Sequence, residues 1–280
     1  MLAKVRNCLL MGTICTGLVT LASPALAGCE PGKVAQKYPE LAGKPLRIGT
    51  TGDSPPFNYR DPKNFDTVIG FNADLMRAVG KCIGVPVEFS VSDFAGLTPG
   101  VQSGHIDIGV STIQYVPARA QQVNFIVYMN GTAGVVLKKD SNRKVESFAD
   151  LCGLKGAATV GGAQIDILQQ VNKTTCSSKP IDVTATPGGP GGPLLVHNDR
   201  VDFYLGPATI QSFDASLFRI AYTYATDNKI GAILKKGNDQ LAQAALDSIQ
   251  ALQADGTEAK LAQTYLLDRA MSAPAELRKQ

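Results

Sequence analysis

The sequence has no long apolar run after its first 28 residues, no strong charge of either sign, and little histidine. Lys and Arg outnumber Asp and Glu by only 27 to 24 in 280 residues, so nothing in the charge balance indicates a polyanionic partner such as nucleic acid. No later apolar run approaches the length of a membrane span. The two histidines, His105 and His197, lie in polar stretches, and the chain has no Cys-x-x-Cys motif. We therefore expect both to be exposed surface residues, and we expect neither a metal nor a cofactor.

The first 27 residues have the pattern of a secretory signal peptide. Lys4 and Arg6 form a basic start, residues 8–22 are apolar apart from Gly and Thr, and the segment ASPALA ends in small residues. The apolar run is too short and wrongly flanked for a stable membrane span. Cleavage after Ala27 removes two positive and no negative charges, so the net charge falls from +3 to +1. We therefore expect a periplasmic protein.

Four cysteines remain after this cleavage: Cys29, Cys82, Cys152 and Cys176. An even number in an oxidising compartment predicts two disulfides. Of the three possible connectivities we prefer Cys29 to Cys82 and Cys152 to Cys176, because the second pair brackets one contiguous segment. An alternative remains open, since LAGC at residues 26–29 has the form of a lipoprotein processing site at which Cys29 is acylated and tethers the chain. That alternative leaves Cys82 without a natural partner.

Strand-like and helix-like segments alternate from Leu46 onward. LRIGT and VPVEFSV alternate apolar and polar residues, whereas GFNADLMRAVGKCIG places Phe71, Leu75, Val79 and Ile83 on one helical stripe. Further predicted strands are IDIGVST, GTAGVVLKK, AATVGG, VDFYLG and RIAYTYA, and further predicted helices are AQIDILQQVNK and two amphipathic segments within residues 238–267 that are separated at ADG. Strands separated by helices of this length imply an α/β fold with parallel sheets.

Two polar stretches, residues 138–146 and 226–229, are the predicted crossings between two lobes. The predicted first lobe comprises residues 46–137 and 229–270, the second lobe residues 138–228, and a C-terminal tail residues 271–280. The Pro- and Gly-rich segment PGGPGGP at residues 187–193 is predicted to be a loop that leads into a short helix. A phosphate-binding loop is disfavoured there, because no Lys followed by Ser or Thr comes next.

The loops that follow the predicted strands carry the candidate binding groups, since ligands of open parallel α/β sheets bind at the carboxyl ends of the strands. These loops contain an aromatic ring, several hydroxyls, a glutamine, one arginine, and a glycine pair that opens a helix. Such a set suits a small anion held by a charge-assisted guanidinium fork and backbone amides. It contains no obvious pair of nucleophile and base.

The stretch LRIGTTGDSPPFNY, followed by GFNADLMRAVG and STIQYVPARAQQVNF, resembles the first lobe of the bacterial extracellular solute-binding proteins of polar amino-acid ABC importers. The likeness covers about residues 46–137, recurs in FADLCGLKGAATVGG and LDSIQALQADGTEAKLAQTYL, and is weaker over residues 174–229. Several motifs in the correct order make it specific. The resemblance implies a two-lobed periplasmic-binding-protein-like fold, each lobe a mainly parallel sheet flanked by helices. It further implies closure on a solute and delivery to an inner-membrane ABC permease, and we expect a monomer.

The resemblance also implies roles for individual residues. Arg119 matches the arginine that grips the α-carboxylate of the ligand, and Phe94 matches the ring that stacks on the ligand. Thr112 and Gln114 match positions that help to hold the carboxylate, although Gln114 departs from the usual Ser or Thr. The loop whose backbone N–H groups meet the same carboxylate matches Gly162, Ala163 and Gln164.

Two departures concern the ammonium end of the ligand. Pro207 stands where relatives that bind α-amino acids carry an aspartate, and Thr51 and Ser54 stand where an aspartate and a tyrosine are common. Asp53 is either a turn residue or a ligand-binding carboxylate. We expect the ligand to be a small solute with a carboxylate, from the class of amino acids, their derivatives and organic acids, whose amino group is absent, substituted or bound by the first lobe.

The expected function is solute binding without catalysis. An alternative is a dehydratase on the same scaffold, such as cyclohexadienyl dehydratase, because TTGDSPPFNYR resembles the opening loop of those enzymes. Such chemistry needs a general acid beside the leaving group, and LGPATIQ supplies no carboxyl in the second-lobe loop where those enzymes carry theirs. A sensory binding subunit is a third possibility that the sequence does not separate from transport.

Overall fold

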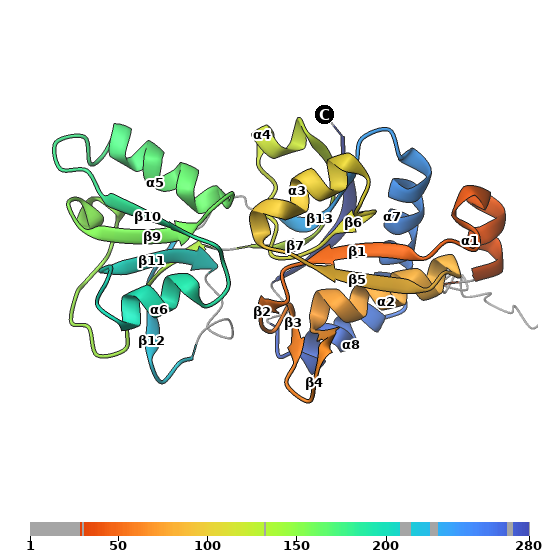
Figure 1. Ribbon diagram of the computed structural model, residues 1–280, viewed down its shortest axis with the longest axis horizontal. Coiled ribbons are helices and arrows are strands. Elements are labelled where there is room, and N and C mark those ends of the chain that lie inside the picture. Colours follow the sequence, from red (N-terminus) through yellow and green to blue (C-terminus); the bar gives the residue numbers. More distant parts are fainter. Residues whose placement is uncertain are drawn as a thin grey trace, which may run out of the picture.

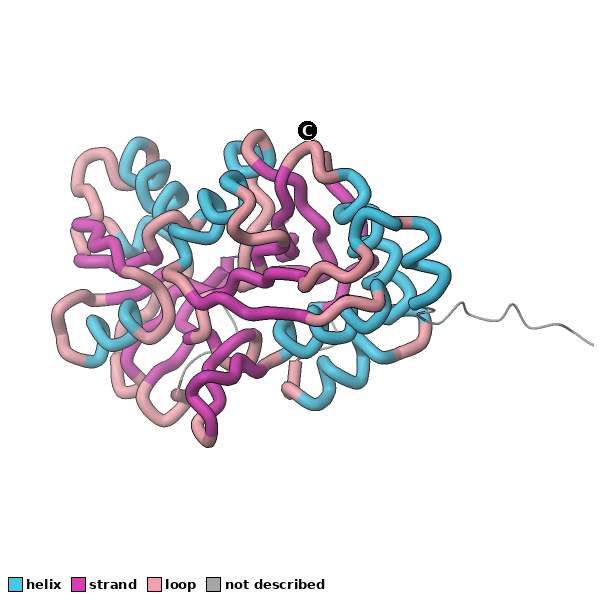
Figure 2. The backbone as a smooth tube through the Cα atoms, turned by 45° about the vertical axis from the view of Figure 1, so that its right-hand side comes forward, coloured by secondary structure: helices cyan, strands magenta, loops and turns pink. Residues whose placement is uncertain are grey.

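The structure, a computed structural model, describes residues 29, 31–131, 133–207, 214–224, 229–267 and 271–279. Two lobes lie side by side along its longest axis, each with a sheet between helices (Figures 1 and 2). The signal peptide predicted at residues 1–27 lies outside the described residues. Within the described ranges, no helix has the length and apolar character that a membrane span requires.

The larger lobe is built on a six-stranded sheet of order β14-β7-β13-β6-β1-β5. Its strands are β1 (Leu46–Thr50), β5 (Val87–Val91), β6 (Ile108–Gly109), β7 (Val123–Asn130), β13 (Lys229–Lys235) and β14 (Ser272–Arg278). β6, β1 and β5 pair in parallel, whereas the pairings β13 to β6, β13 to β7 and β14 to β7 are antiparallel. β13 and β14 therefore run against the other four strands, so the sheet is mixed, and its parallel pairings lie at the β6-β1-β5 end.

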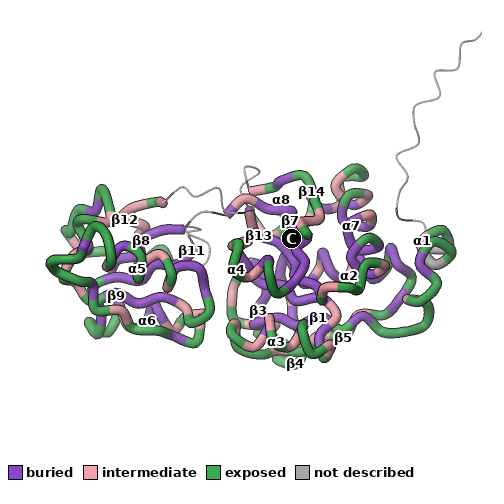
Figure 3. The backbone as a smooth tube through the Cα atoms, turned by 90° about the horizontal axis from the view of Figure 1, so that it is seen from above, coloured by how far each residue is buried: buried purple, intermediate pink, exposed green. Residues whose placement is uncertain are grey.

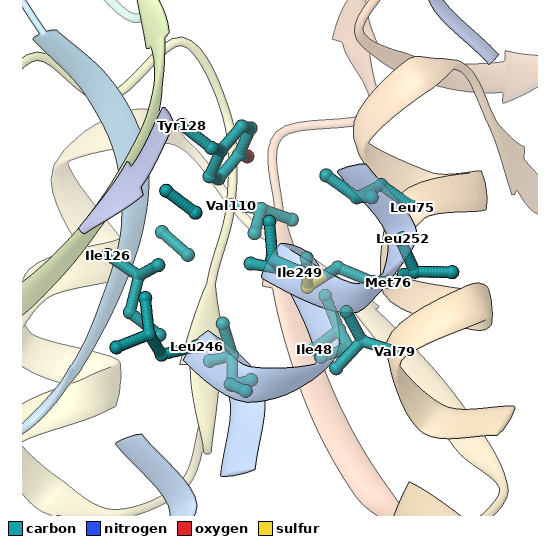
Figure 4. Packing of buried hydrophobic residues seen from close by; sticks show 14 of the residues in the cluster. Ile48, Leu75, Met76, Val79, Val110, Ile126, Tyr128, Leu246, Ile249 and Leu252 are labelled. Atoms are coloured by element: carbon teal, nitrogen blue, oxygen red, sulfur yellow. The ribbon is translucent and has the colours of Figure 1, made fainter. Parts of the chain in front are cut away.

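Helices cover both faces of this sheet. They are α2 (Phe71–Ile83), α3 (Phe94–Ser103), α4 (Pro117–Ala120), α7 (Asp239–Ala254) and α8 (Thr257–Thr264), with α1 (Pro31–Lys37) and the 3₁₀ turn η1 (Pro39–Leu41) at the N-terminal side. The predicted apolar stripe of α2 is buried, and the helix ends at Gly84, which takes a left-handed conformation. Figure 4 shows Leu75 and Val79 of this stripe in one cluster with Ile48 and with the α7 residues Ile249 and Leu252.

Strand β7 contributes side chains to the hydrophobic cores on both faces of the sheet. Ile126 and Tyr128 belong to the core beneath α2 and α7, whereas the alternate residues Phe125 and Val127 belong to the core beneath α3. All four are at most 1% exposed. Because successive side chains of a strand point to opposite faces, the run FIVYM at residues 125–129 is the pattern of a central strand that is covered on both sides.

The smaller lobe has a five-stranded sheet of order β10-β9-β11-β8-β12. Its elements are β8 (Ala133–Lys138), η2 (Phe148–Leu151), β9 (Lys155–Thr159), α5 (Ala163–Lys173), β10 (Asp182–Thr186), α6 (Gly191–His197), β11 (Phe203–Pro207) and β12 (Phe218–Tyr224). Only β8 runs against the others, because it pairs antiparallel with both β11 and β12. The buried strands lie inside this lobe and exposed helices and loops lie outside (Figure 3).

The predicted lobe boundaries need two corrections. Strand β8 joins the sheet of the smaller lobe, so the chain first crosses between β7 and β8, before the predicted stretch at residues 138–146. Residues 139–146 are instead a loop of the smaller lobe. The predicted second crossing overlaps residues 225–228, which lie outside the described part, and β12 and β13 flank them.

The predicted C-terminal tail is the second correction. Residues 272–278 form β14, which pairs with β7 at the edge of the larger sheet. Its alternate residues Ala273 and Ala275 are each 5% exposed. The carbonyls of both accept hydrogen bonds from glutamines of α7, and these contacts hold the strand in the first lobe.

The structure contains both predicted disulfides. Cys29 is bonded to Cys82 in α2, with the two Cα atoms 4.7 Å apart, and Cys152 is bonded to Cys176, with Cα atoms 5.1 Å apart. The first bond fixes the start of the described chain on the larger lobe. The second links two residues of the smaller lobe that are 24 positions apart and lie on either side of α5 in the sequence. Both bonds reduce the conformational entropy of the unfolded chain.

Candidate functional site

A cavity of about 240 Å³ is lined by residues of both lobes. The larger lobe contributes the turn after β1, the first residue of α3 and the segment after β6. The smaller lobe contributes the end of β9, the second residue of β11, the start of α5 and the turn before α6. The described lining residues are Thr51, Asp53, Ser54, Pro55, Phe94, Ser111, Thr112, Thr159, Gly162, Gln164, Gly188, Gly189, Pro190 and Tyr204. Most of the larger-lobe segments and the start of α5 belong to the loops that the sequence indicated at the carboxyl ends of strands, whereas Thr159, Gly188 to Pro190 and Tyr204 were not indicated. The predicted loop at residues 206–209 contributes no described lining residue.

Five of the nine residues proposed from the sequence line this cavity: Asp53, Phe94, Thr112, Gly162 and Gln164. Phe94 opens α3, and the Asp93 carboxylate caps that helix by accepting a hydrogen bond from the Gly96 N–H at 2.8 Å. The cap orients the first turn of α3, so the Phe94 ring is placed by the helix end.

The Arg119 guanidinium lies beside the cavity and connects the lobes. Its Nη1 donates to the carbonyl of Gln114 in the larger lobe at 2.7 Å, and its Nη2 donates to the carbonyl of Gly161 in the smaller lobe at 2.5 Å. Its Cζ lies 5.7 Å from the centre of the Phe94 ring. Burial lowers the pKa of Arg119 and the Asp166 carboxylate opposes this effect, but an arginine side chain stays protonated in proteins. The site therefore holds a partly desolvated positive charge.

The N-terminus of α5 lies next to this charge. Gly162 is the N-cap, Ala163 is the first helical residue, and both Gly162 and Gln164 line the cavity. The first N–H groups of a helix have no partner within the helix and carry a partial positive charge. Arg119 is not itself a lining residue, but its guanidinium and the helix end, two positive features, lie next to each other beside the cavity, which is an arrangement suited to an anionic group.

Two further residues proposed from the sequence, Gln114 and Pro207, do not line the cavity. Gln114 is 5% exposed and pairs with Ile230 near the start of β13, so it sits beside the second crossing and does not line the cavity. Its carbonyl serves Arg119, whereas its side-chain Oε1 is buried with no hydrogen-bond partner among the described residues. Pro207 ends β11 opposite Ala133 of β8. His105 and His197 are exposed, and neither lines the cavity.

A buried hydrogen-bond network, which the sequence did not indicate, supports the larger-lobe wall. Tyr128 donates to Asn72 Oδ1 at 2.9 Å, Asn72 donates to Asn58 Oδ1 at 2.8 Å, and Asn58 donates to the Thr51 hydroxyl at 3.1 Å. Thr51 and Ser111, whose hydroxyls lie 3.3 Å apart, line the cavity. Because Tyr128, Asn72 and Asn58 are each 0% exposed, the network links the core of the lobe to the hydroxyls of the site and fixes their positions.

Tyr204 and Thr159 form the corresponding polar wall of the smaller lobe. Their hydroxyls lie 3.0 Å apart, and Tyr204 is 3% exposed. Burial raises the pKa of Tyr204, and the negative charge of Asp53 adds to the rise while the hydrogen bond with Thr159 opposes it. Tyr204 therefore stays a neutral phenol at neutral pH.

Comparison with known proteins decides the family. Residues 46–268 match the model of the bacterial extracellular solute-binding proteins, family 3. The chain belongs to this family. It is 31% identical over 157 residues to the arginine-binding extracellular protein ArtP of Bacillus subtilis (strain 168), a match that covers 56% of each chain. The probable amino-acid-binding protein YxeM of the same strain is 27% identical over 255 residues, covering 86% of this chain and 89% of YxeM.

A solved structure agrees with the fold of this solute-binding protein. An ancestral arginine-binding protein bound to arginine superposes with a TM-score of 0.71 at 26% identity, covering 79% of this chain and 97% of that one. The chain thus spans little more than half the length of ArtP and almost the whole of the ancestral protein. The two-lobed α/β fold predicted from the sequence is confirmed.

Proposed function

We propose that this protein is the extracytoplasmic substrate-binding component of an ABC uptake system, that it acts as a monomer, and that its cavity takes a small solute with a carboxylate group. The observation that carries the proposal is the meeting of the Arg119 guanidinium and the N-terminus of α5 beside a cavity shared by two lobes. A guanidinium and backbone N–H groups are the donors best matched to a carboxylate.

Arg119 has the donors for two tasks. A guanidinium carries five N–H donors, so one side chain can bond the carbonyls of Gln114 and Gly161 and still bind a carboxylate. The bond to Gly161 forms only when the lobes are together, whereas the bond to Gln114 lies within the larger lobe. The ligand carboxylate and the closing contact thus share one cation, and this sharing couples capture of the solute to closure.

The compared relatives support an amino-acid-like ligand. ArtP and the ancestral protein are named for arginine, and YxeM for an amino acid, and every amino acid carries the carboxylate that this site suits. The cavity of about 240 Å³ is smaller than the pockets of about 300–1,000 Å³ that hold drug-sized ligands, so it suits a small solute.

Catalysis is not part of the proposal. A dehydratase needs a general acid beside the leaving group. Among the described residues, the smaller lobe lines the cavity with Thr159, Gly162, Gln164, Gly188, Gly189, Pro190 and Tyr204, which include no carboxyl group. The compared relatives are named as binding proteins.

We propose a periplasmic protein that is released from its signal peptide without lipidation. The Sγ atom of Cys29 is bonded to Cys82, and a sulfur in a disulfide cannot carry a thioether-linked lipid. The mass of the intact mature protein, measured without reduction, is expected to equal that of the chain from Gly28 with two disulfides. A mass increased by a diacylglyceryl group would contradict both the first disulfide and this localisation.

A thermal-shift panel tests the proposed function. It contains L-amino acids, their 2-hydroxy analogues, opine-like compounds, and mono- and dicarboxylic acids. We expect at least one carboxylate at about 100 times its dissociation constant to raise the free energy of unfolding by about 2.7 kcal/mol, because it binds only the folded chain. Amines without a carboxylate, such as agmatine, are the matched controls and should give no shift. Stabilisation by agmatine but by no carboxylate would contradict the proposal.

A further inference from the structure

Tyr204 has the largest side chain among the described residues that the smaller lobe contributes to the cavity wall. The other described wall residues of this lobe are Thr159, Gly162, Gln164, Gly188, Gly189 and Pro190. Tyr204 is the second residue of β11 and shares a core cluster with Val196 of α6. Its neighbours Phe203 and Leu205 belong instead to the core cluster that contains Leu168 of α5. The buried Tyr204 ring therefore lies on the α6 side of the sheet.

Two glycines hold the Tyr204 ring in place. A Cβ at Gly206 would lie 2.1 Å from Cε1 of the ring, and a Cβ at Gly192 would lie 2.2 Å from Cδ2. These ring atoms belong to opposite edges, so the ring is packed between β11 and α6 with no room for a side chain at either edge. The Tyr204 hydroxyl lies 3.0 Å from the hydroxyl of Thr159. The ring cannot move sideways without displacing backbone, so it forms a rigid part of the wall.

Tyr204 and Arg119 border different parts of the cavity. Arg119 contacts the loop at Gly161, beside the N-terminus of α5. Burial and the negative charge of Asp53 both raise the pKa of Tyr204, and a Cβ at Gly189 would lie 2.2 Å from Asp53 Oδ2. Asp53 belongs to a small sheet of the larger lobe, formed by β2 (Asp53–Ser54), β3 (Asn58–Asp61) and β4 (Asn64–Ile69). A ligand whose carboxylate lies beside Arg119 thus points its other end toward Tyr204.

We propose that Tyr204 is a specificity-determining residue that closes the far end of the cavity and limits the ligand to a short group at that end. The proposal rests on the proposed function and narrows its ligand class to carboxylates that carry a short chain. A longer chain would have to displace the ring, which Gly192 and Gly206 keep from moving sideways, and overpacking of this kind disfavours binding. A shorter chain loses contact with the ring. The site should therefore bind one chain length best.

Tyr204→Leu tests this end wall, because it removes the ring and keeps an apolar side chain in β11. The space of the lost ring is continuous with the cavity, since Tyr204 lines it. The probes are the unbranched L-2-amino acids from L-alanine to L-2-aminooctanoate and the matching L-2-hydroxy acids, each titrated by calorimetry. In the wild-type protein at least one series should have a best member, and the member longer by one methylene should bind about 10- to 200-fold more weakly. Tyr204→Leu should lower this ratio to about 1 or reverse it.

Tyr222→Leu is the matched control, since Tyr222 packs against Phe148 in the same lobe and does not line the cavity. Both leucine variants should lower the melting temperature, because each loses a packed ring, but Tyr222→Leu should keep the wild-type ratio. Tyr204→Phe removes only the hydroxyl, so it should fold as the wild type does and lower the ratio by less than Tyr204→Leu.

Three results would overturn the role of Tyr204 and leave the proposed function standing. They are wild-type protein that binds short and long members of each series equally, Tyr204→Leu protein that keeps the wild-type ratio, and, if Tyr204→Leu does not fold, an unchanged ratio in Tyr204→Phe. Wild-type protein that binds no member of either series also overturns this inference, and the thermal-shift panel of other carboxylates then decides the proposed function separately.

Discussion

Replacing Arg119 with alanine is expected to weaken ligand binding by about 30-fold to several thousand-fold. Removing one partner of a buried, hydrogen-bonded charge pair costs about 2–5 kcal/mol, because the other charge stays desolvated without its partner. Arg119 is partly buried, lies beside the N-terminus of α5, and bonds the carbonyl of Gly161 across the lobes. The substitution therefore removes both the carboxylate clamp and a closing contact.

Arg119→Lys should restore only part of the affinity, since an ammonium group cannot bond two carbonyls and a carboxylate in the geometry of a planar fork. Arg47→Ala is the control, because Arg47 bonds Asp107 on the larger lobe and does not line the cavity. It should bind the ligand as the wild type does. Calorimetric titration with the tightest ligand of the panel measures all three variants, and an Arg119→Ala affinity within threefold of the wild type would contradict the clamp.

Gly189→Ala is expected to weaken binding by about 5- to 150-fold by opposing closure. A methyl group at this position would lie 2.2 Å from Asp53 Oδ2 and 3.0 Å from Asp53 Cβ, so closing the lobes requires Asp53 or the loop to move. Overpacking of this kind costs typically about 1–3 kcal/mol, and the whole cost falls on the closed state because Asp53 and Gly189 belong to different lobes. The apparent dissociation constant then rises as the closed fraction falls.

Gly237→Ala controls for the backbone strain. Gly189 has a φ of +54°, which an alanine adopts at a cost of about 1–2 kcal/mol, and Gly237 has a φ of +85° with no atom within 4 Å of an added Cβ. Both variants should lose stability, as measured by urea unfolding, but only Gly189→Ala should lose affinity. Equal affinities for the two variants would show that the loop at Gly189 does not approach Asp53 during binding.

The local elements were predictable wherever one short-range pattern decided them. The helix expected at AQIDILQQVNK is α5, and the stripe from Phe71 to Ile83 is the buried face of α2. The disulfide partners preferred from cysteine number and chain spacing, with lipidation of Cys29 left open, are the pairs that the structure contains. In each case the information lies within a few turns of chain or in a small count, so a single sequence contains it.

The sheet to which a strand belongs was not predictable in the same way. GTAGVVLKK was correctly expected to be a strand, but its alternation does not say whether β7 or β11 is its neighbour. The sequence pattern of the last ten residues did not indicate a strand pairing either. Residues Ser272 to Arg278 form a strand through their contacts with β7 and α7. Long-range pairing is decided by which surfaces remain uncovered after the rest of the chain has folded.

The residues of the candidate site were also only partly predictable from the sequence. The loops that carry Asp53, Phe94, Thr112 and Gly162 were identified because parallel strands bring their carboxyl ends to one edge. Tyr204 was hidden inside a strand that looked like ordinary core, and Gly188 to Pro190 looked like a plain turn. These residues line the cavity only because the opposing lobe lies against them. That contact joins residues far apart in the chain, so a local sequence pattern does not reveal it.

Small-angle scattering of the wild-type protein, with and without the tightest carboxylate of the panel, measures whether the two lobes close on the ligand. We expect the unliganded protein to be the more extended, and we expect saturating ligand to lower its radius of gyration to the value calculated from this structure, in which Arg119 and Gly161 are in contact. Identical scattering profiles with and without a ligand that calorimetry shows to be bound would contradict capture by closure of the two lobes.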